Sequence, residues 1–222
     1  SNFAKLKKAL VVVDNTLATP INQNPLSLGA DVVVHSATKF LCGHSDAIGG
    51  IACGNKNIIN NIFHFREING ACLDPNPAYL ILRGMKTLAL RMERHNENAL
   101  ELSDWLLKHK NVERVFYPGI VGHNGHNVAR KQMKGYGGVL SFSIKDQNAM
   151  PSFISNLKFA HAAAHLGSLD TVVGPPKTTS HVENTPEERK KLGIPENLIR
   201  CSVGIEHIDD IKNDFDQALN IL

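Results

Sequence analysis

Two short runs of apolar, mostly β-branched residues constrain the fold more than any other feature of this sequence. They are ALVVV at residues 9–13 and DVVV at residues 31–34. Neither run alternates apolar with polar residues, which is typical of strands buried on both faces of a parallel sheet. The runs therefore predict two buried parallel strands of an α/β protein, with a short helix over residues 26–30 between them.

The pattern changes in the second half of the chain. Apolar residues at helical spacing predict helices over residues 57–68 and 78–108. Shorter elements are expected afterwards, namely strands over 112–116, 138–144 and 199–203, helices over 149–157 and 186–191, and a closing helix from Asp209 with Ile211, Phe215, Ala218 and Leu222 on one stripe. This α+β pattern places a domain boundary inside the long helix near residue 92, so that the domains are residues 1–92 and 93–222. The aromatic side chains at helix and strand positions are expected in the core; they are Phe63, Phe65, Trp105 and Tyr117.

Composition limits the possible classes of function. The 222 residues are 42% hydrophobic and 20% charged, as in an ordinary globular protein with a substantial core. A net charge of +3, with Lys and Arg scattered outside one short block, gives no electrostatic footprint for nucleic acid. We find no apolar run long enough for a membrane span and no signal-peptide pattern, so we expect no membrane partner. The four cysteines form no CxxC pair and are irregularly spaced, which favours a reducing cytoplasm.

The chemistry is clearest where the two apolar runs end. Asp14 closes the first run, at the edge where open α/β sheets gather their ligands. Lys39 follows the second run in the stretch HSATK, where partial burial is expected to lower the pKa of its ammonium group. Taken alone, Asp14 is also the kind of residue that caps a helix or forms a turn.

Two cofactor or nucleophile hypotheses fit the HSATK stretch. Ser36-Ala37-Thr38-Lys39 spells S-x-x-K, which β-lactamases and penicillin-binding proteins use to activate a serine, but the companion S-D-N and K-T-G motifs do not occur in this sequence. Asp14 and Lys39 together instead suit pyridoxal 5'-phosphate (PLP), in which a lysine forms a Schiff base and an acid pairs with the pyridinium nitrogen. Ser36 and Thr38 would then donate hydrogen bonds to the phosphate.

Two histidine pairs raise a metal-binding alternative. His161 and His165 are four residues apart, and His123 and His126 are three apart, which on a helix would place both rings of a pair on one face. Such a site also needs a helix and a third ligand, whereas GHNGH is interrupted by glycine and HAAAH runs toward a loop. We therefore expect no metal site, and histidines that are ordinary or face the substrate.

Long stretches of the sequence resemble the Cys/Met-metabolism PLP-dependent enzymes, the group of cystathionine γ-synthase, cystathionine γ-lyase and methionine γ-lyase. The resemblance covers nearly the whole chain in order. Its clearest segments are DNTLATPINQNPLSLGADVVVHSATKFLCGHSDAIGG, LRGMKTLALRMERHNENAL, YPGIVGHNGHNVARKQMKGYGGVLSFSI and IRCSVGIEHIDDI.

The resemblance implies a role for each candidate residue. Lys39 would be the Schiff-base lysine, Asp14 the partner of the pyridine nitrogen, and Ser36 and Thr38 ligands of the phosphate. Arg200 would bind the substrate α-carboxylate, although the sequence around it alone suggests a surface arginine on a strand. The reaction would be γ-elimination or γ-replacement on sulfur amino acids or activated homoserine.

The resemblance also implies an architecture. The chain would be the C-terminal part of a fold type I, aspartate-aminotransferase-like PLP-binding large domain, followed by a smaller α+β C-terminal domain. The complete enzyme would be a homotetramer built from dimers.

Two departures from the family pattern change what we expect of this chain. The family's glycine-rich phosphate loop, ring-stacking tyrosine and Tyr/Arg segment do not occur in it, so we expect part of a longer enzyme that binds PLP weakly and is inactive alone. The family usually has Ser or Asn before the Leu-Gly of its substrate loop, where this sequence has His165, so we include His165 among the substrate-binding residues. The alternatives are a catalytically incomplete fragment or assembly subunit of such an enzyme, and a histidine-based metal-binding protein.

Overall fold

The structure is a computed structural model that describes residues 2–146 and 148–221. Its contacts divide the chain into two compact units. Unit 1 comprises the residues up to Leu90 together with Gln132–Lys134, and unit 2 comprises Arg91–Lys131 and Gly135 onward.

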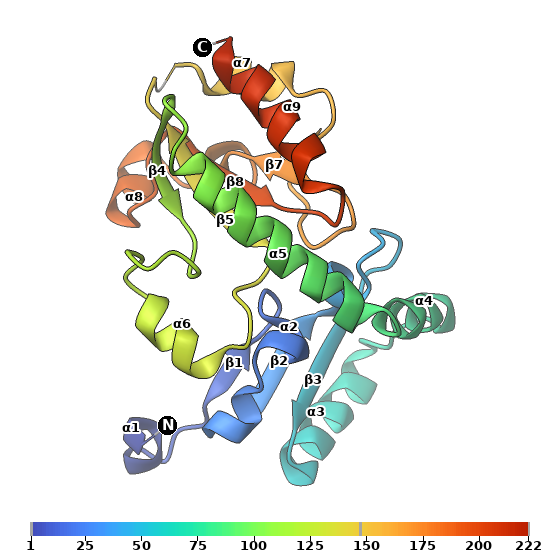
Figure 1. Ribbon diagram of the computed structural model, residues 1–222. Helices are drawn as coiled ribbons and strands as arrows, with labels where there is room; N and C mark the ends of the chain where they lie inside the picture. Colours follow the sequence, from blue (N-terminus) through green and yellow to red (C-terminus); the bar gives the residue numbers. More distant parts are fainter. Residues whose placement is uncertain (1, 147, 222) are drawn as a thin grey trace. The chain divides into compact units, whose positions relative to one another are not determined.

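The helices and strands are given below in chain order, and Figure 1 labels most of them. Up to the end of unit 1 they are α1 (Asn2–Leu6), β1 (Val12–Asp14), α2 (Thr19–Asn22), η1 (Pro25–Leu28), β2 (Val32–Ser36), η2 (Ala37–Leu41), β3 (Gly50–Gly54), α3 (Lys56–Asn69) and α4 (Pro75–Met85). The remainder are α5 (Leu88–Leu106), β4 (Val112–Phe116), α6 (His126–Gln132), β5 (Val139–Ile144), α7 (Met150–Asn156), β6 (His161–Ala162), β7 (Val172–Gly174), η3 (Pro176–Thr178), α8 (Pro186–Lys191), β8 (Leu198–Ser202) and α9 (Ile208–Asn220).

Unit 1 contains a mixed sheet in the order β1-β2-β3, in which β1 and β2 are parallel and β2 and β3 antiparallel. The two apolar runs do form neighbouring parallel strands, as predicted, with η1 in the crossover. Val32 and Val33 of the central strand are buried. The prediction of burial is wrong for β1, where Val12 is 59% exposed. Among the described residues β1 has a strand on one side only, so its side chains have fewer neighbours to cover them. The strand β3 was not anticipated.

The predicted helix over residues 78–108 is in fact two helices. The helix α4 ends at Met85, where the Lys86 and Thr87 amides donate to the carbonyls of Arg83 and Gly84, and α5 begins at Leu88. Each of these hydrogen bonds spans three residues instead of the four of an α-helix. The last turn of α4 is therefore tighter, and the helix ends there. Apolar spacing continues across the break, which is why the sequence pattern did not reveal it.

The helix α3 agrees with the predicted boundaries but not with the expected burial. None of its residues is buried, and Phe63 and Phe65 are 47% and 70% exposed. The prediction that these two aromatic residues belong to the core is therefore wrong. The helix ends at Gly70, which adopts the left-handed conformation with φ 70°. The Arg66 guanidinium lies over the Phe63 ring, 4.6 Å from its centroid.

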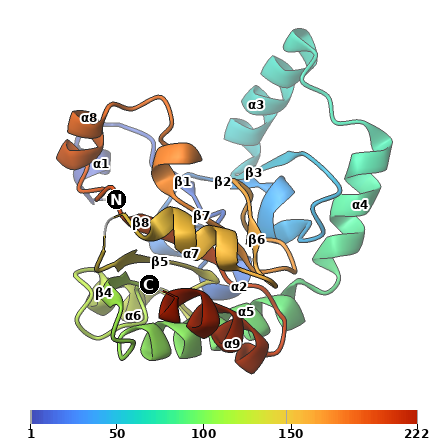
Figure 2. The ribbon, with the colours of Figure 1, turned by 90° about the horizontal axis from the view of Figure 1, so that it is seen from above.

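Unit 2 is built on a five-stranded mixed sheet in the order β4-β5-β8-β7-β6. Adjacent strands in this sheet are antiparallel, except that β6 and β7 are parallel to each other. The predicted strands correspond to β4, β5 and β8, and the short strands β6 and β7 were not anticipated. Helices α5 and α9 lie side by side in both views (Figures 1 and 2), and the Lys212 Nζ on α9 is 2.5 Å from the Glu101 Oε1 on α5.

The hydrophobic core of unit 2 joins the sheet to α5, α7 and α9. It includes Leu102 from α5, Phe153 from α7 and Phe215 from α9, all with no exposed area, and Tyr117 is equally buried, as expected. Trp105 is half-buried at the edge of this core. The closing helix packs with the predicted stripe, and its Asp209 and Asp210 lie in the first turn; the expected contribution of Leu222 lies outside the described residues.

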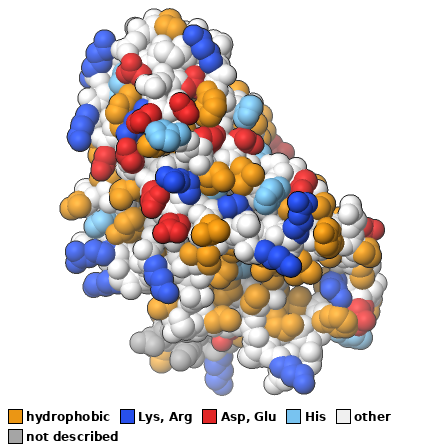
Figure 3. Space-filling view, turned by 45° about the vertical axis from the view of Figure 1, so that its right-hand side comes forward, with side chains coloured by type: hydrophobic (Ala, Val, Ile, Leu, Met, Phe, Trp, Pro, Cys, Tyr) orange, Lys and Arg blue, Asp and Glu red, His pale blue; other side chains and the backbone are white. Residues whose placement is uncertain are grey.

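On the face seen in Figure 3, positive and negative side chains are interspersed with hydrophobic ones. None of the helices in the described part of the chain is long and apolar enough to cross a membrane. The four cysteines all lie in the described ranges, and none of them forms a disulfide there.

Candidate active site

The first group of candidate residues lies where β1 and β2 end. Parallel pairing sets Asp14 opposite Val34, and the Asn15 amide donates to the Val34 carbonyl at 2.9 Å. Because β1 ends at Asp14 and β2 at Ser36, both residues lie at the carboxyl edge of the sheet, where α/β proteins bind ligands.

Thr16 links these two strand ends. Its amide donates to the Asp14 Oδ1 at 2.9 Å, and its hydroxyl oxygen accepts the Ser36 amide at 2.8 Å. Hydrogen bonds from Thr16 lower the pKa of the Asp14 carboxyl, so the exposed carboxylate is held in its charged form. The turn hypothesis for Asp14 is thus correct as local geometry. We did not select Thr16 from the sequence, although a hydroxyl residue just after Asp is a turn signal.

Thr38 is fixed by Gly49, which precedes β3. The Gly49 amide donates to the Thr38 Oγ1 at 3.1 Å, and the Gly49 carbonyl accepts the Ala37 amide at 2.8 Å. Since Oγ1 accepts a hydrogen bond, its own proton can be directed to another acceptor; the Gly49 carbonyl is 3.4 Å away, a long contact. The Thr38 hydroxyl can therefore donate to an anion at the sheet edge.

Lys39 lies in η2, a single π-helical turn directly after β2. Its backbone departs from helical values, with φ −85° and ψ −133°, and its side chain is half-buried. The next two residues, Phe40 and Leu41, are buried and anchor the turn in the interior. Single π-helical turns are often found at functional sites, and this one carries Lys39 directly after Thr38.

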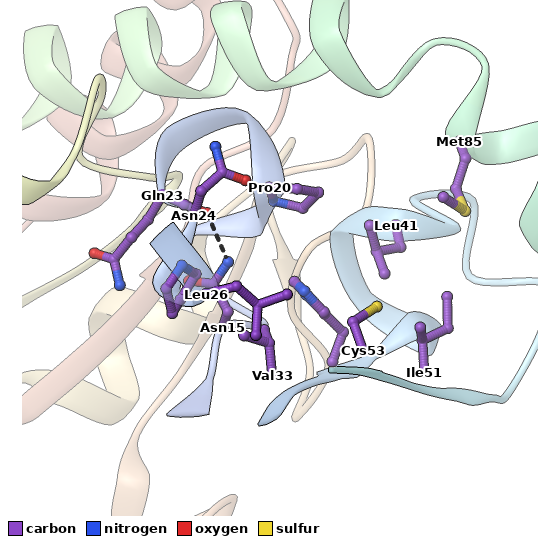
Figure 4. A pocket seen from close by; sticks show the side chains of 12 residues that line it. Asn15, Pro20, Gln23, Asn24, Leu26, Val33, Leu41, Ile51, Cys53 and Met85 are labelled. Atoms are coloured by element: carbon purple, nitrogen blue, oxygen red, sulfur yellow. Dashed lines mark hydrogen bonds between the residues drawn. The ribbon is translucent and has the colours of Figure 1, made fainter. Parts of the chain in front are cut away.

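A cavity of about 220 Å³ lies beside this region within unit 1 (Figure 4). Its walls are mainly apolar and are formed by Asn15, Pro20, Gln23, Asn24, Pro25, Leu26, Val33, His35, Leu41, Ile51, Cys53 and Met85. The Asn15 Nδ2 donates to the Gln23 carbonyl at 3.0 Å. Within the described chain, the buried Asn15 Oδ1 and His35 Nδ1 have no hydrogen-bond partner. Burial lowers the pKa of His35, which favours its neutral imidazole.

The second group of candidate residues lies in unit 2. Arg200 on β8 donates from Nη2 to the carbonyls of Ala164 and His165, at 2.7 and 3.0 Å. Arg200 is half-buried, not a plain surface residue, and burial lowers the pKa of its guanidinium. Its buried Nε has no hydrogen-bond partner among the described residues. A desolvated guanidinium with an unmatched donor is well suited to bind a carboxylate.

The loop that carries His165 is tied to the same strand at a second point. The Gly167 amide donates to the Ser202 Oγ at 2.9 Å, two residues after Arg200. The structure therefore brings the two proposed substrate residues of unit 2 together, and it brings the four proposed cofactor residues of unit 1 together at one sheet edge. No sequence signal indicated that Arg200 would hold the backbone of the His165 loop.

The histidine pairs do not share helical faces. His161 lies in β6, and His165 lies in a loop after it; α6 begins at His126, so His123 lies outside that helix. The His126 Nδ1 is 2.8 Å from the Pro118 carbonyl, and the His123 Nδ1 accepts the Gly125 amide at 3.1 Å. Across residues 2–146 and 148–221, we find no cluster of three or more His, Cys, Asp or Glu side chains suited to a metal ion.

Similar known proteins identify the family of this chain. The family model described as Cys/Met metabolism PLP-dependent enzyme matches residues 1–220. A cystathionine beta-lyase of Lactococcus lactis is 44% identical over 220 residues, covering 99% of this chain and 58% of the relative. An L-methionine gamma-lyase of Fusobacterium nucleatum is 46% identical over 213 residues, covering 95% of this chain and 54% of the relative.

Solved structures show the same similarity. The crystal structure of cystathionine gamma synthase from Xanthomonas oryzae in complex with cystathionine has a TM-score of 0.96 at 36% identity, covering 99% of this chain and 57% of that chain. The chain thus spans a little over half the length of these proteins. It belongs to the family of Cys/Met metabolism PLP-dependent enzymes, and it has an α/β fold with mixed sheets.

Proposed function

We propose that this chain forms part of a PLP-dependent transsulfuration-type enzyme, which acts on sulfur amino acids or activated homoserine by γ-elimination or γ-replacement. The observation that carries the proposal is the convergence of Asp14, Ser36, Thr38 and Lys39 at the carboxyl edge of one sheet. A carboxylate, two hydroxyl groups and an amine are the groups that PLP requires at its nitrogen, phosphate and aldehyde.

The donor set fits this cofactor. The lowered pKa of Asp14 keeps a negative charge available for a protonated ring nitrogen. The Thr38 hydroxyl, with Gly49 donating to its oxygen, has a proton to offer to a phosphate, and Ser36 supplies a second hydroxyl. When bound, PLP supplies an aldehyde for the lysine and a ring that accepts electrons from the substrate.

Lys39 and Arg200 carry the chemistry and the binding in this proposal. The Lys39 amine removes and returns the proton at the substrate α-carbon, which requires a neutral amine near physiological pH. The Arg200 guanidinium binds the α-carboxylate with its remaining donors, while Nη2 holds the loop that bears His165. His165 then lies in the loop that contacts the substrate. We propose that it affects which substrate side chain the enzyme accepts.

The names of the relatives support a transsulfuration-type reaction and include more than one reaction of that type. Their names include cystathionine beta-lyase, L-methionine gamma-lyase and cystathionine gamma-synthase, so closely related sequences serve β-elimination, γ-elimination and γ-replacement. Each reaction begins with a proton removed at the α-carbon, which is the step assigned to Lys39. We propose carbon–sulfur bond cleavage or formation as the common activity.

The proposal extends to domains, assembly and compartment. Residues 1–92 would be the C-terminal part of a fold type I PLP-binding large domain, and residues 93–222 a small α+β domain; the division into two compact units supports this assignment. A homotetramer and a cytoplasmic location follow from the family resemblance, and four cysteines outside any disulfide in the described chain are compatible with a reducing compartment.

A labelling experiment tests the assignment of Lys39. The enzyme containing this chain is incubated with PLP and reduced with borohydride, and the pyridoxyl group is located by mass spectrometry. We expect the label on Lys39, and we expect Lys39→Ala to remove it. The exposed Lys56 at the start of α3 gives a matched control, since Lys56→Ala should leave the labelling unchanged. Label at another lysine in the wild-type enzyme would refute the assignment.

A second experiment tests the role of Arg200. Arg200→Lys keeps the charge but cannot donate both to the loop carbonyls and in parallel to a carboxylate. Loss of one charged hydrogen bond corresponds to about 1.5–3 kcal/mol, so kcat/KM should fall roughly tenfold or more. Arg114→Lys on the exposed part of β4 is the control. An unchanged kcat/KM in Arg200→Lys would mean that Arg200 has only a structural role.

A further inference from the structure

The turn that carries Lys39 is held at its beginning by β3 and its preceding loop. The Ala37 amide donates to the Gly49 carbonyl at 2.8 Å, and the Thr38 amide donates to the same oxygen at 3.3 Å. These contacts fix the two residues before Lys39. They do not fix the residues after it, so the direction of the lysine also depends on how the turn ends.

The end of the turn is held by contacts centred on Cys42. The Cys42 amide donates to the Ala37 carbonyl at 2.9 Å, and the Gly43 amide donates to the Lys39 carbonyl at 2.8 Å. The buried Cys42 thiol donates to the Asp46 Oδ1 at 3.1 Å, which closes the short loop between them. Asp46 is exposed, so this contact ties a surface residue to the back of the Lys39 turn.

A glycine in α4 permits the main chain of Cys42 to pack directly against that helix. A Cβ built on Gly84 would lie 2.9 Å from the Cys42 carbonyl carbon and closer still to its oxygen. Contacts under about 3 Å to backbone atoms are not tolerated, so any other residue at this position must move either the helix or the turn. Gly84 is itself buried, and the Thr87 Oγ1 donates to its carbonyl at 3.3 Å, which fixes the helix end.

We propose that Gly84 is a positioning residue for Lys39. It acts through Cys42, whose packing on α4 and hydrogen bond to Asp46 determine where the turn places the lysine. This inference rests on the proposed function of Lys39. It goes beyond that function because it assigns the position of the Lys39 side chain to Gly84 and to the contact between the Cys42 thiol and the Asp46 carboxylate. Neither takes part in the chemistry.

Gly84→Ala is the first test. Added volume should displace the Cys42 carbonyl, so the Cys42 and Gly43 amides, which bond to Ala37 and Lys39, should exchange hydrogen about tenfold faster. The rate of pyridoxyl labelling at Lys39 should fall about tenfold, because small misplacements of a reacting group reduce rates strongly. Gly122→Ala is the matched control, because nothing lies within 4 Å of a Cβ at Gly122.

Asp46 provides a second test that does not disturb the buried packing. Asp46→Ala removes the acceptor for the Cys42 thiol at an exposed position, whereas Asp46→Asn retains an oxygen at the same place. We expect slower labelling and faster Gly43 exchange in the alanine variant, and substantial recovery of both in the asparagine variant. A role limited to overall stability would instead lower the unfolding temperature without this difference.

The two readouts separate this inference from the proposed function. Wild-type labelling at a different lysine would refute the function while leaving the packing of Gly84 and Cys42 intact. Label on Lys39 in the wild type, together with unchanged labelling and exchange rates in Gly84→Ala and Asp46→Ala, would overturn the positioning role.

Discussion

The helices α3 and α9 are of similar length and both carry apolar residues, but their surroundings differ completely. α9 in unit 2 buries Ile211, Phe215, Ala218 and Leu219, whereas α3 in unit 1 buries none of its residues. A similar contrast holds between edge strands, since Val112 of β4 is buried whereas Val12 of β1 is 59% exposed. An apolar pattern therefore predicts that a segment forms an element, but not that the element is covered.

The difference means that the two units should respond differently to mutation. Unit 2 has a continuous core that stabilises its sheet from within the chain. Unit 1 holds the proposed cofactor residues mainly through backbone and hydroxyl hydrogen bonds at the strand ends, with apolar surface left on its outer elements.

The largest effect is expected for Phe215→Ala in unit 2. The Phe215 ring has no exposed area and lies 5.5 Å from Phe153 and 6.1 Å from Phe142, measured between centroids. Its removal leaves a cavity, and such substitutions cost about 3–5 kcal/mol. Denaturant unfolding should show this loss in the free energy of unfolding. A loss as small as that of a surface variant would mean that the core of unit 2 is not tightly packed.

Acidification should destabilise unit 2 through His95. Burial lowers the pKa of His95 to about 4, although its Nδ1 contacts the Val203 carbonyl at 2.7 Å. The unfolded chain binds a proton near pH 6.5 and the folded chain only near pH 4, so stability present above pH 6.5 is lost as pH falls between these values. By pH 4 the loss would be roughly 3 kcal/mol.

Unfolding free energies measured at pH 7, 5.5 and 4 check this dependence. His95→Gln, which does not titrate, should reduce the slope, and His207→Gln at an exposed position is the control. An equal slope in wild-type and His95→Gln proteins would contradict a neutral His95 in the folded state.

A smaller effect is expected at the start of α3. The Asn55 Oδ1 accepts the Ile58 amide at 3.0 Å, which caps the helix. Since α3 has no buried residue to stabilise it, this local contact should matter for the helix, and Asn55→Ala should cost about 1 kcal/mol. Hydrogen exchange of the α3 amides measures the change. Asn55→Ser, which retains an accepting oxygen, should recover most of the protection; failure to do so would weaken the capping argument.

The smallest effect on stability is expected for Phe65→Ser. The Phe65 side chain is 70% exposed, so its removal should change the free energy of unfolding by no more than about 0.5 kcal/mol. Sedimentation should instead show less self-association, because a large exposed aromatic group has been removed from the surface. A loss comparable with that of Phe215→Ala would show that α3 is covered in solution, and would remove the contrast between the two units.

Much of the local structure could be predicted from the sequence. Unbroken β-branched runs indicated the parallel pair β1 and β2, and helical spacing indicated α3 and α9. The break between α4 and α5 could not be predicted, because it depends on a tightened last turn at Lys86 and Thr87, and the apolar spacing continues across it. The short strands β6 and β7 were missed because neither lies in a longer apolar run such as the one that contains β1, and two or three residues alone carry too little pattern to be recognised.

The sequence alone determined which chemical groups the candidate site contains. Asp14, Ser36, Thr38 and Lys39 follow predicted strands, and the positions at which strands end are local properties of the chain. The tertiary structure decided how those groups are held, through Thr16 between the strand ends, Gly49 beside Thr38 and Gly84 behind Cys42. It also decided that Arg200 holds the loop of His165, 35 residues away in the chain. Such contacts depend on how distant segments pack in three dimensions, which local spacing and residue type do not record.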